Sequence, residues 1–319
     1  MSRTGRFFTA FLLTALVAAV FAGACAYNYA KESPVFSAVS EKSAEADGGQ
    51  PRDAHTEDAV QSVPLACVMY HNILKSRKGT YIVSPSQFEG DLAAYRAAGY
   101  TTVFPSEVAD FVYGNGALPE KPLLVTFDDG RYNNMYYGLP LLQKYGAKAV
   151  LCPVGAFSAF STESGDHSNP NYSHVTWGQM DELQKSGCFE LGNHSYNMHR
   201  YEPRFGIKRK AGESRAEYKE ALRADAGRLQ DEILRATGTL PVTYAYPFGA
   251  YCDDALAVLR SLGFRIFLTC NEGVSVIRRG APETLFQLKR VNRDGALTSS
   301  EVVSRLEKFA GNAAARGNA

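Results

Sequence analysis

Two adjacent carboxylates and two nearby imidazoles are the side chains of this 319-residue chain that could do chemistry together. Asp128 and Asp129 follow one apolar run, and His194 and His199 follow another. Side chains alternate along a strand, so one carboxylate can bind a metal while its neighbour stays free to act as a base. An ion held by one Asp and two His keeps open positions for water, lowers the pKa of that water and polarises a carbonyl oxygen. The pattern therefore predicts metal-assisted hydrolysis.

The spacing of the histidines predicts the local backbone. His194 and His199 are five residues apart, and on an ideal helix they would point about 140° apart. Both can face one ion only if a bend or loop intervenes, so we expect non-regular backbone between them. A third segment, the tight turn Pro247-Phe248-Gly249, follows a further apolar run.

Each of these segments also has a purely structural interpretation. Asp-Asp-Gly is often a turn with an Asx hydrogen bond, Pro247-Phe248-Gly249 alone is simply a turn, and His194 alone could be a core or loop histidine. Their conjunction favours a site, because the carboxyl ends of parallel strands collect at one face of an α/β fold.

The apolar runs that position these residues recur throughout residues 64–319, a length near the roughly 250 residues of a single (β/α) barrel. Short apolar or β-branched runs are typical of buried parallel strands. The predicted strands are 65–70, 101–104, 123–127, 149–152, 189–193, 242–246, 264–269 and 285–291.

Helices are predicted between most of these strands. A Ser or Thr followed three residues later by Gln or Glu is a capping box, and glycine commonly ends a helix. Alternating strands and helices indicate a parallel α/β sheet, and at this length a barrel is favoured over an open doubly wound sheet. The predicted helices start at Ser84 with Pro85 and Gln87, at Thr176 with Gln179 and at Ser214 with Glu217, and end near Gly99, Gly187 and Gly238.

The N-terminal residues are predicted to lie outside this fold. Arg3 and Arg6 precede the uncharged run 7–30, the arrangement of a secretory signal or an N-terminal membrane anchor. Residues 22–26 offer small-residue cleavage sites, yet the run exceeds the roughly 20 residues that span a bilayer, so an uncleaved anchor is slightly favoured. Either one predicts an extracellular or cell-surface protein. Residues 31–63 carry seven acids, three bases and one aromatic residue, which indicates a disordered polar linker.

Composition excludes several other classes of protein. The chain is 45% apolar, which rules out disorder throughout, and its formal charge of +1 offers no general attraction to nucleic acid. The six cysteines are dispersed without a C-x-x-C pair, so neither a structural zinc site nor a disulfide framework is expected, and Cys67, Cys152 and Cys270 are predicted core residues. No G-x-G-x-x-G or Walker sequence follows a strand, and no G-x-S-x-G is present.

The segment Thr126-Phe127-Asp128-Asp129-Gly130 resembles the first motif of the NodB-homology polysaccharide deacetylases, carbohydrate esterase family 4. This resemblance, which extends over residues 64–291, implies a distorted (β/α) barrel with Asp128 as the general base and Asp129 as a metal ligand. His194 with Ser195 is similar to the second motif. Most of the family has its second histidine at the position of Met198, but the branch resembling poly-N-acetylglucosamine deacetylases uses a five-residue spacing, which implies His199 as the third ligand.

The segment Tyr246-Pro247-Phe248-Gly249 is similar to the third motif, which lines one wall of the substrate groove. The resemblance places an oxyanion-stabilising backbone N–H at Phe248, with Tyr246 and Pro247 against the substrate. The family's usual arginine two residues before the proline is replaced by Ala245, so we expect Arg290 to orient the base instead.

Two further features concern the substrate and the proton donor. The family's Leu-x-His motif, which usually supplies a general acid, is missing, because no histidine follows His199. His71 is either a contributor to the site or a structural residue packed below it. Aromatic rings suit stacking on sugars, and Tyr196 and Tyr251, together with Tyr132 and Trp177, flank the motifs.

These features predict a metal-dependent hydrolase that removes N-acetyl groups from an extracellular N-acetylglucosamine polymer and releases acetate. Zinc suits a mixed Asp and His ligand set, although Co²⁺, Ni²⁺ or Fe²⁺ also fit. Alternative substrates are peptidoglycan and O-acetylated xylan. The missing arginine and late histidine leave open a glycan-binding domain with little activity, although the retained Asp128 favours an enzyme. The basic stretch 200–223 is either a site for an anionic polymer or, as we favour, a solvated face.

Overall fold

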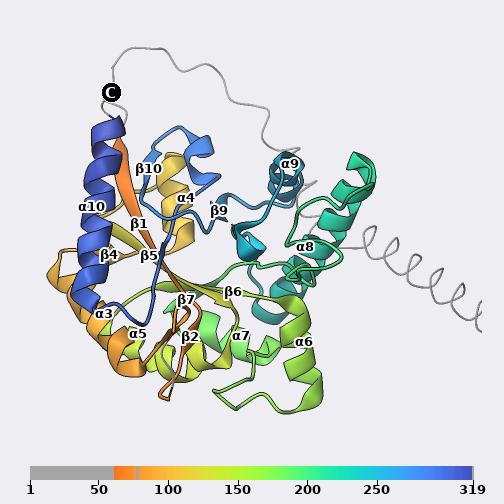
Figure 1. Cartoon of the computed structure of the whole chain (residues 1–319), viewed down its shortest axis with the longest axis horizontal. Helices are drawn as coiled ribbons and strands as arrows, with labels where there is room; N and C mark the ends of the chain where they lie inside the picture. The colour runs from red at the N-terminus through yellow and green to blue at the C-terminus, as the bar shows by residue number, and fades with distance from the viewer. Residues whose placement is uncertain (1–60, 77–78, 318–319) are drawn as a thin grey trace, which may run out of the picture. The chain divides into compact units, whose positions relative to one another are not determined.

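The computed structural model describes residues 61–76 and 79–317, and Figure 1 shows a central group of strands with helices around it. The predicted hydrophobic segment 1–30 and nearly all of the predicted linker 31–63 lie outside these described residues. Within the described ranges, no helix combines the length and the apolar character needed to cross a bilayer.

The central strand is β1 (Ser62–Tyr70), and β5 (Pro122–Asp129), β6 (Ala149–Pro153) and β7 (Phe189–Leu191) follow it in parallel order. β1, β5 and β6 each contain a buried apolar run, as expected for parallel strands covered on both faces. β10 (Ser275–Arg278) pairs antiparallel with the other edge of β1.

A second group of strands closes the ring. β8 (Thr243–Ala245) and β9 (Ile266–Leu268) pair in parallel, and single bridges join Asn193 to Tyr244 and Leu268 to Leu288. β11 (Val291–Asn292) then pairs in parallel with β1. The architecture is therefore the predicted distorted (β/α) barrel, held at two places by isolated bridges rather than by full ladders.

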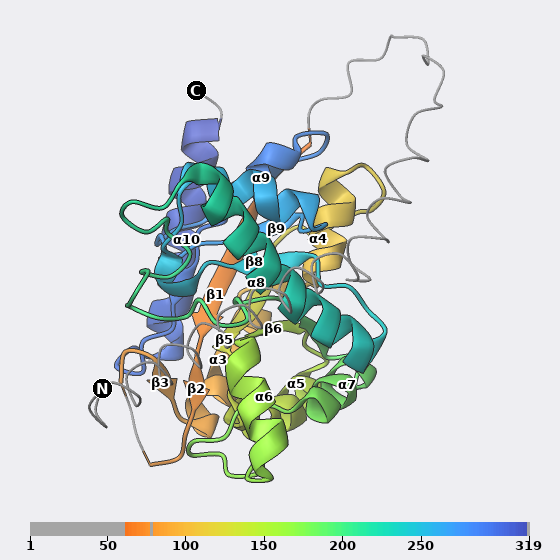
Figure 2. The ribbon, with the colours of Figure 1, turned by 90° about the vertical axis from the view of Figure 1, so that its right-hand side faces the viewer.

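The predicted helix starts are confirmed. Ser84, Thr176 and Ser214 each cap a helix through a complete capping box. Helices α3 and α10 lie together on one side of the barrel and α7 and α8 on another (Figures 1 and 2). The helices are α3 (Pro85–Ala97), α4 (Pro105–Val112), α5 (Leu139–Tyr145), α6 (Gly155–Ser164), α7 (Trp177–Lys185), α8 (Arg215–Thr237), α9 (Asp253–Ser261) and α10 (Ser299–Gly317).

Two of the predictions are wrong in detail. Residues 285–291 do not form a continuous strand: a 3₁₀ turn (Pro282–Leu285) precedes the bridge at Leu288 and the short β11, because its apolar side chains fill the core without a regular ladder. Cys270 is exposed rather than in the core, since it follows the end of β9. The short strands β2 (Asn72–Ile73) and β3 (Ile82–Val83) were shorter than a sequence pattern can specify, and β4 (Thr101–Thr102) covers only the first two residues of the predicted strand 101–104.

Strand alternation divides the core into an inner and an outer cluster and directs the polar residues. Leu65 and Cys67 of β1 and Leu124 of β5 belong to the inner cluster, whereas Val68 and Phe127 belong to the outer one beneath the helices. Continuing this period of two along β5 places the side chains of residues 126 and 128 on the inner face. The first carboxylate of the motif is thus aimed into the barrel by the strand itself.

Candidate active site at the carboxyl ends of the strands

Asp128 lies at the carboxyl end of β5 in a buried ion pair with Arg290. The Arg290 guanidinium donates one hydrogen bond to each carboxylate oxygen, both of 2.8 Å, and the two side chains are 0% and 2% exposed. Arg290 also donates from Nε to the Thr269 carbonyl at 2.8 Å and from Nη1 to the Thr126 hydroxyl at 3.1 Å. Burial opposes ionisation of Asp128, but Arg290 outweighs it and holds the pKa of Asp128 well below its usual range. Asp128 is therefore a carboxylate at neutral pH.

Asp129, His194 and His199 converge on one point beside this pair. Asp129 Oδ1 lies 3.8 Å from His194 Nε2 and 3.4 Å from His199 Nε2, and the three ligand atoms all lie within 4.8 Å of one another. Asp129 Oδ1 is buried and has no hydrogen-bond partner among the described residues. One carboxylate and two imidazoles at this spacing are a fitting set of donors for a divalent cation. The predicted ligands thus form a candidate metal site.

The two imidazoles are prepared for ligation in different ways. His194 Nδ1 lies 2.8 Å from the Ala245 carbonyl, and a hydrogen bond there leaves the Nε2 lone pair free for a metal. Burial, reinforced by the neighbouring His194, lowers the pKa of His199 to about 4. A metal ligand must be unprotonated, so the environment already favours the form of His199 that binds.

The backbone between the two histidines is irregular, as predicted, and is clamped from two helices. Asp225 of α8 accepts hydrogen bonds from the amides of Tyr196 and Asn197, both of 2.8 Å. From the start of α6, the amides of Gly155 and Ala156 donate to the carbonyls of residues 195 and 196. The amides and the carbonyls of the loop therefore both have hydrogen-bond partners, and these bonds hold His199 beside the first histidine, His194.

Backbone strain is concentrated at these motifs. Among the described residues, the non-glycine residues with positive φ are Asp129 (70°), Ser195 (67°) and Phe248 (58°), one in each motif. Such conformations cost about 1–3 kcal/mol each and cluster at functional sites. The next residue, Gly130, also has a positive φ, of 71°. A Cβ at this position would lie 2.7 Å from the Pro153 side chain, so only glycine fits there. The sequence shows Asp-Asp-Gly, but only the structure shows the strain.

A cavity of about 460 Å³ opens over the ligand cluster. His71 lines it, as one of the two sequence interpretations proposed, and so do the Phe248 ring and Asp128. Sequence reasoning missed several other lining residues, although Tyr201 and Phe205, two and six positions after His199, were a visible signal. These missed residues are Met69, Tyr81, Tyr201, Phe205, Cys270 and Asn292.

The remaining predicted substrate contacts lie away from the cavity lining. Tyr246 is 1% exposed and stacks on Tyr251 with ring centroids 4.3 Å apart, and Pro247 is buried beside them. Tyr196 packs beneath Arg228, whose guanidinium carbon lies 3.7 Å from the ring centroid. These residues therefore support the cavity-lining residues and do not line the cavity themselves.

Comparison with known proteins agrees with this geometry. Residues 115–267 match the family model of polysaccharide deacetylases. The matched segment is similar to the polysaccharide deacetylase family and covers just under half of this chain. A poly-beta-1,6-N-acetyl-D-glucosamine N-deacetylase of Escherichia coli strain K12 is 26% identical over 254 residues, which cover 70% of this chain and 37% of the relative. The match therefore spans little more than a third of that relative's length.

Solved structures share the fold. IcaB from Ammonifex degensii is 25% identical with a TM-score of 0.61, over 76% of this chain and 97% of that one. A de-N-acetylase from Aggregatibacter actinomycetemcomitans is 23% identical with a TM-score of 0.64, over 76% of this chain and 100% of that one.

Two site residues come from outside the matched segment. Arg290 follows the match and His71 precedes it. Ala245 stands at the usual arginine position, and Arg290 reaches Asp128 instead from the segment before β11. Arg290 therefore contacts Asp128 as expected, although the two residues are 162 positions apart in the sequence.

Proposed function

We propose that this protein is a polysaccharide deacetylase that hydrolyses the N-acetyl groups of a polymer containing N-acetylglucosamine and releases acetate. The observation that carries the proposal is the division between the two adjacent carboxylates. Asp128 is paired with Arg290 yet borders the cavity, whereas Asp129 faces two imidazoles. Relatives from E. coli and Staphylococcus aureus are poly-beta-1,6-N-acetyl-D-glucosamine N-deacetylases, which supports that polymer as the substrate.

Asp129, His194 and His199 would hold the divalent cation. We propose zinc as the ion, because Zn²⁺ sites in proteins commonly combine carboxylate and imidazole ligands. Co²⁺, Ni²⁺ and Fe²⁺ suit the same ligand set. When bound, such a cation lowers the pKa of water and polarises a substrate carbonyl.

The chain's own residues perform the proton transfers. Asp128, ionised and oriented by Arg290, accepts a proton from the attacking water as its oxygen adds to the acetamide carbon. The backbone N–H of Phe248, whose direction is set by its left-handed conformation, donates to the developing oxyanion. The C–N bond then breaks, and the proton held by Asp128 passes to the departing nitrogen. The products are acetate and a free amine.

His71 is the proposed polar contact to the substrate. It lines the cavity, and its Nδ1 is buried without a hydrogen-bond partner among the described residues. Burial lowers the pKa of His71, so the ring is neutral at pH 7 and can donate or accept one hydrogen bond there. A sugar hydroxyl or the acetamide group would satisfy that nitrogen.

The proposed location is outside the cytoplasm, either secreted or held at the cell surface. Support comes from the sequence of residues 1–30, whose two arginines and uncharged run are typical of a signal or anchor. Such a location would expose the enzyme to an extracellular polymer.

The full chain, stripped of metal with a chelator, provides the test. We expect acetate release from β-1,6-linked N-acetylglucosamine oligomers only after Zn²⁺ or Co²⁺ is restored, with one free amine for each acetate. Asp128→Asn should abolish release while still binding the ion, and Asp110→Asn, an exposed helix position, should match the parent. Release that survives chelation, or full activity of Asp128→Asn, would contradict the mechanism. Release from acetylated xylan or peptidoglycan alone would overturn the proposed substrate.

A further inference from the structure

Exposed aromatic side chains gather at this cavity. Among the described residues, seven large hydrophobic side chains are exposed, and three of them line the cavity: Tyr81 (53%), Tyr201 (70%) and Phe205 (40%). Exposed apolar groups that gather in one place mark binding surfaces, whereas scattered ones need no explanation. Tyr113, Tyr136, Phe160 and Tyr172 are the scattered ones.

Two of these residues extend from the metal ligands as a layered stack. The centroid of the Phe248 ring lies 4.2 Å from that of the His199 ring. Phe205 stacks on Phe248 with centroids 5.3 Å apart and an interplanar angle of 5°, and Tyr201 also stacks on Phe248, at 4.7 Å and 23°. We call Tyr201, Phe205 and Phe248 the aromatic platform. It leads without interruption from a ligand imidazole to the rim of the cavity.

The backbone holds this platform in place. The Gly206 amide donates to the Arg200 carbonyl at 3.0 Å, and the Ile207 amide donates to the Ala250 carbonyl at 3.2 Å. A Cβ at position 206 would lie 2.6 Å from the Pro247 carbonyl oxygen, so glycine permits the loop to sit directly on the third motif. The loop that carries Tyr201 and Phe205 is therefore fixed to the same turn that carries Phe248.

We propose that the aromatic platform is a second sugar subsite, which binds the ring next to the one being deacetylated. This inference rests on the proposed function and deepens it by naming the side chains that bind a second ring of the polymer. A β-linked glucosamine ring carries its ring substituents equatorially, so each face presents axial C–H groups that match a flat aromatic surface. The near-parallel rings offer such a surface within the cavity that holds Asp128 and Asp129. The proposed occupant is therefore a pyranose ring of the same polysaccharide molecule that is being deacetylated.

Oligomer length tests the proposal. We would measure kcat and KM of the zinc-loaded full chain on β-1,6-linked N-acetylglucosamine oligomers of increasing length. Tyr201→Ala and Phe205→Ala should each raise KM for the trisaccharide by about five- to tenfold with kcat retained. Both variants should change KM for the monosaccharide far less than KM for the trisaccharide. Tyr201→Phe should behave as the parent, because the ring and not the hydroxyl provides the surface.

The control is Phe160→Ala, which removes an equally exposed ring, 70%, from α6. It should leave every kinetic constant unchanged. Calorimetric titration of Asp128→Asn with the trisaccharide gives a second readout that needs no turnover, and adding Tyr201→Ala to that variant should weaken binding by the same factor. An equal effect on monosaccharide and trisaccharide, or none on either, would overturn the subsite. If the parent showed no turnover but oligomer binding still depended on the Tyr201 ring, the proposed function would be overturned and the subsite would stand.

Discussion

Two buried Asp–Arg pairs lie on either side of β11, and they do different work. Arg290 precedes the strand and pairs with Asp128, while Arg293 follows it and pairs with Asp91 of α3. In both pairs the guanidinium donates to both carboxylate oxygens. By burial, charge and geometry the two pairs are nearly equivalent.

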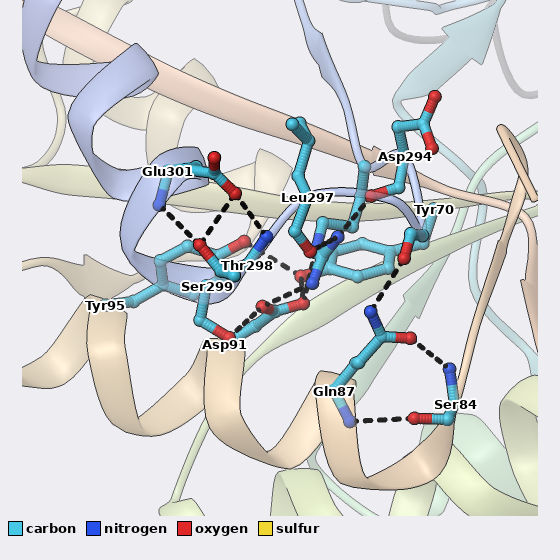
Figure 3. A network of polar contacts seen from close by, with 12 residues as sticks. Tyr70, Ser84, Gln87, Asp91, Tyr95, Asp294, Leu297, Thr298, Ser299 and Glu301 are labelled. Atoms are coloured by element: carbon cyan, nitrogen blue, oxygen red, sulfur yellow. Dashed lines mark hydrogen bonds and ion pairs between the residues drawn. The ribbon is translucent and has the colours of Figure 1, made fainter. Parts of the chain in front are cut away.

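They differ in how completely the carboxylate is satisfied. Asp91 accepts from Tyr70, from Ser299 and twice from Arg293. Figure 3 shows this network, in which Arg293 also donates to the carbonyls of Asp294 and Leu297. The bonds described for the Asp128 side chain come from Arg290, and Asp128 borders the cavity. Acceptor capacity that faces open space, and not the ion pair itself, distinguishes a reactive carboxylate from a structural one.

The backbone makes the same distinction. Asp91 lies within the regular helix α3, so its position costs no strain. Asp128 precedes Asp129, whose φ of 70° is unfavourable for a residue with a Cβ. Strain is stored where ligands must converge, and the Asp91 network helps to hold α3 and α10 to β1 around it.

Breaking the reactive pair should have the largest effect. Arg290→Met leaves Asp128 buried without its partner, so burial then raises the pKa of Asp128. We expect kcat to fall by about 10²–10⁴ at neutral pH and the acid limb of the pH–rate profile to move to higher pH. Steady-state kinetics from pH 4 to 9 check this. An unshifted profile would show that Arg290 does not set the state of Asp128.

Breaking the structural pair should instead reduce stability. Removing one partner of a buried ion pair costs about 3–5 kcal/mol, so Asp91→Asn should lower the free energy of unfolding by that order. Activity per folded molecule should persist. Urea unfolding and kinetics of the same preparation separate the two effects. The double variant Asp91→Leu with Arg293→Met should lose less stability than Asp91→Asn, and a selective loss of kcat in either would contradict the assignment.

Stability of the metal-free protein should fall with acid in a defined window. Burial lowers the pKa of His199, and likewise that of His174, from 6.5 to about 4. Between these values the unfolded chain binds protons that the folded chain does not, so stability is complete above pH 6.5 and is lost as pH falls toward 4. The loss is on the order of 3 kcal/mol for each histidine.

A ligand and a non-ligand can be compared in this window. His199→Gln and His174→Gln should each flatten the dependence of the unfolding free energy on pH. Of the two, His199→Gln alone should abolish zinc binding in a competition titration. If His174→Gln also abolished it, the ligand set Asp129, His194 and His199 would be incomplete.

The smallest expected effect concerns the clamp on the ligand loop. Asp225→Asn retains one acceptor for the amides of Tyr196 and Asn197 but loses the second. Zinc affinity should fall by about tenfold, as for other residues that orient metal ligands. Glu220→Gln changes an exposed acid on the same helix and should leave affinity unchanged. Equal affinities in both variants would show that the loop holds its shape without Asp225.

Local features of the chain were predictable from the sequence. Capping boxes at Ser84, Thr176 and Ser214, the principal strands, and the irregular loop between the histidines depend on residues close in sequence. Alternation along β5 likewise directs Asp128 inward without reference to any distant residue. Such features are encoded locally because the backbone has few soft torsions and strong local preferences.

The tertiary structure decided what meets across the barrel. Asp91 and Arg293 are 202 residues apart, and nothing in the helix pattern around Asp91 marks it as buried. The rings of Tyr201 and Phe205 reach the cavity because their loop rests on the third motif, whereas Tyr246 and Tyr251 stack on each other. A sequence lists which groups are available and where each strand ends. Their contacts depend on how distant segments pack, because close packing selects one arrangement from many that local preference allows.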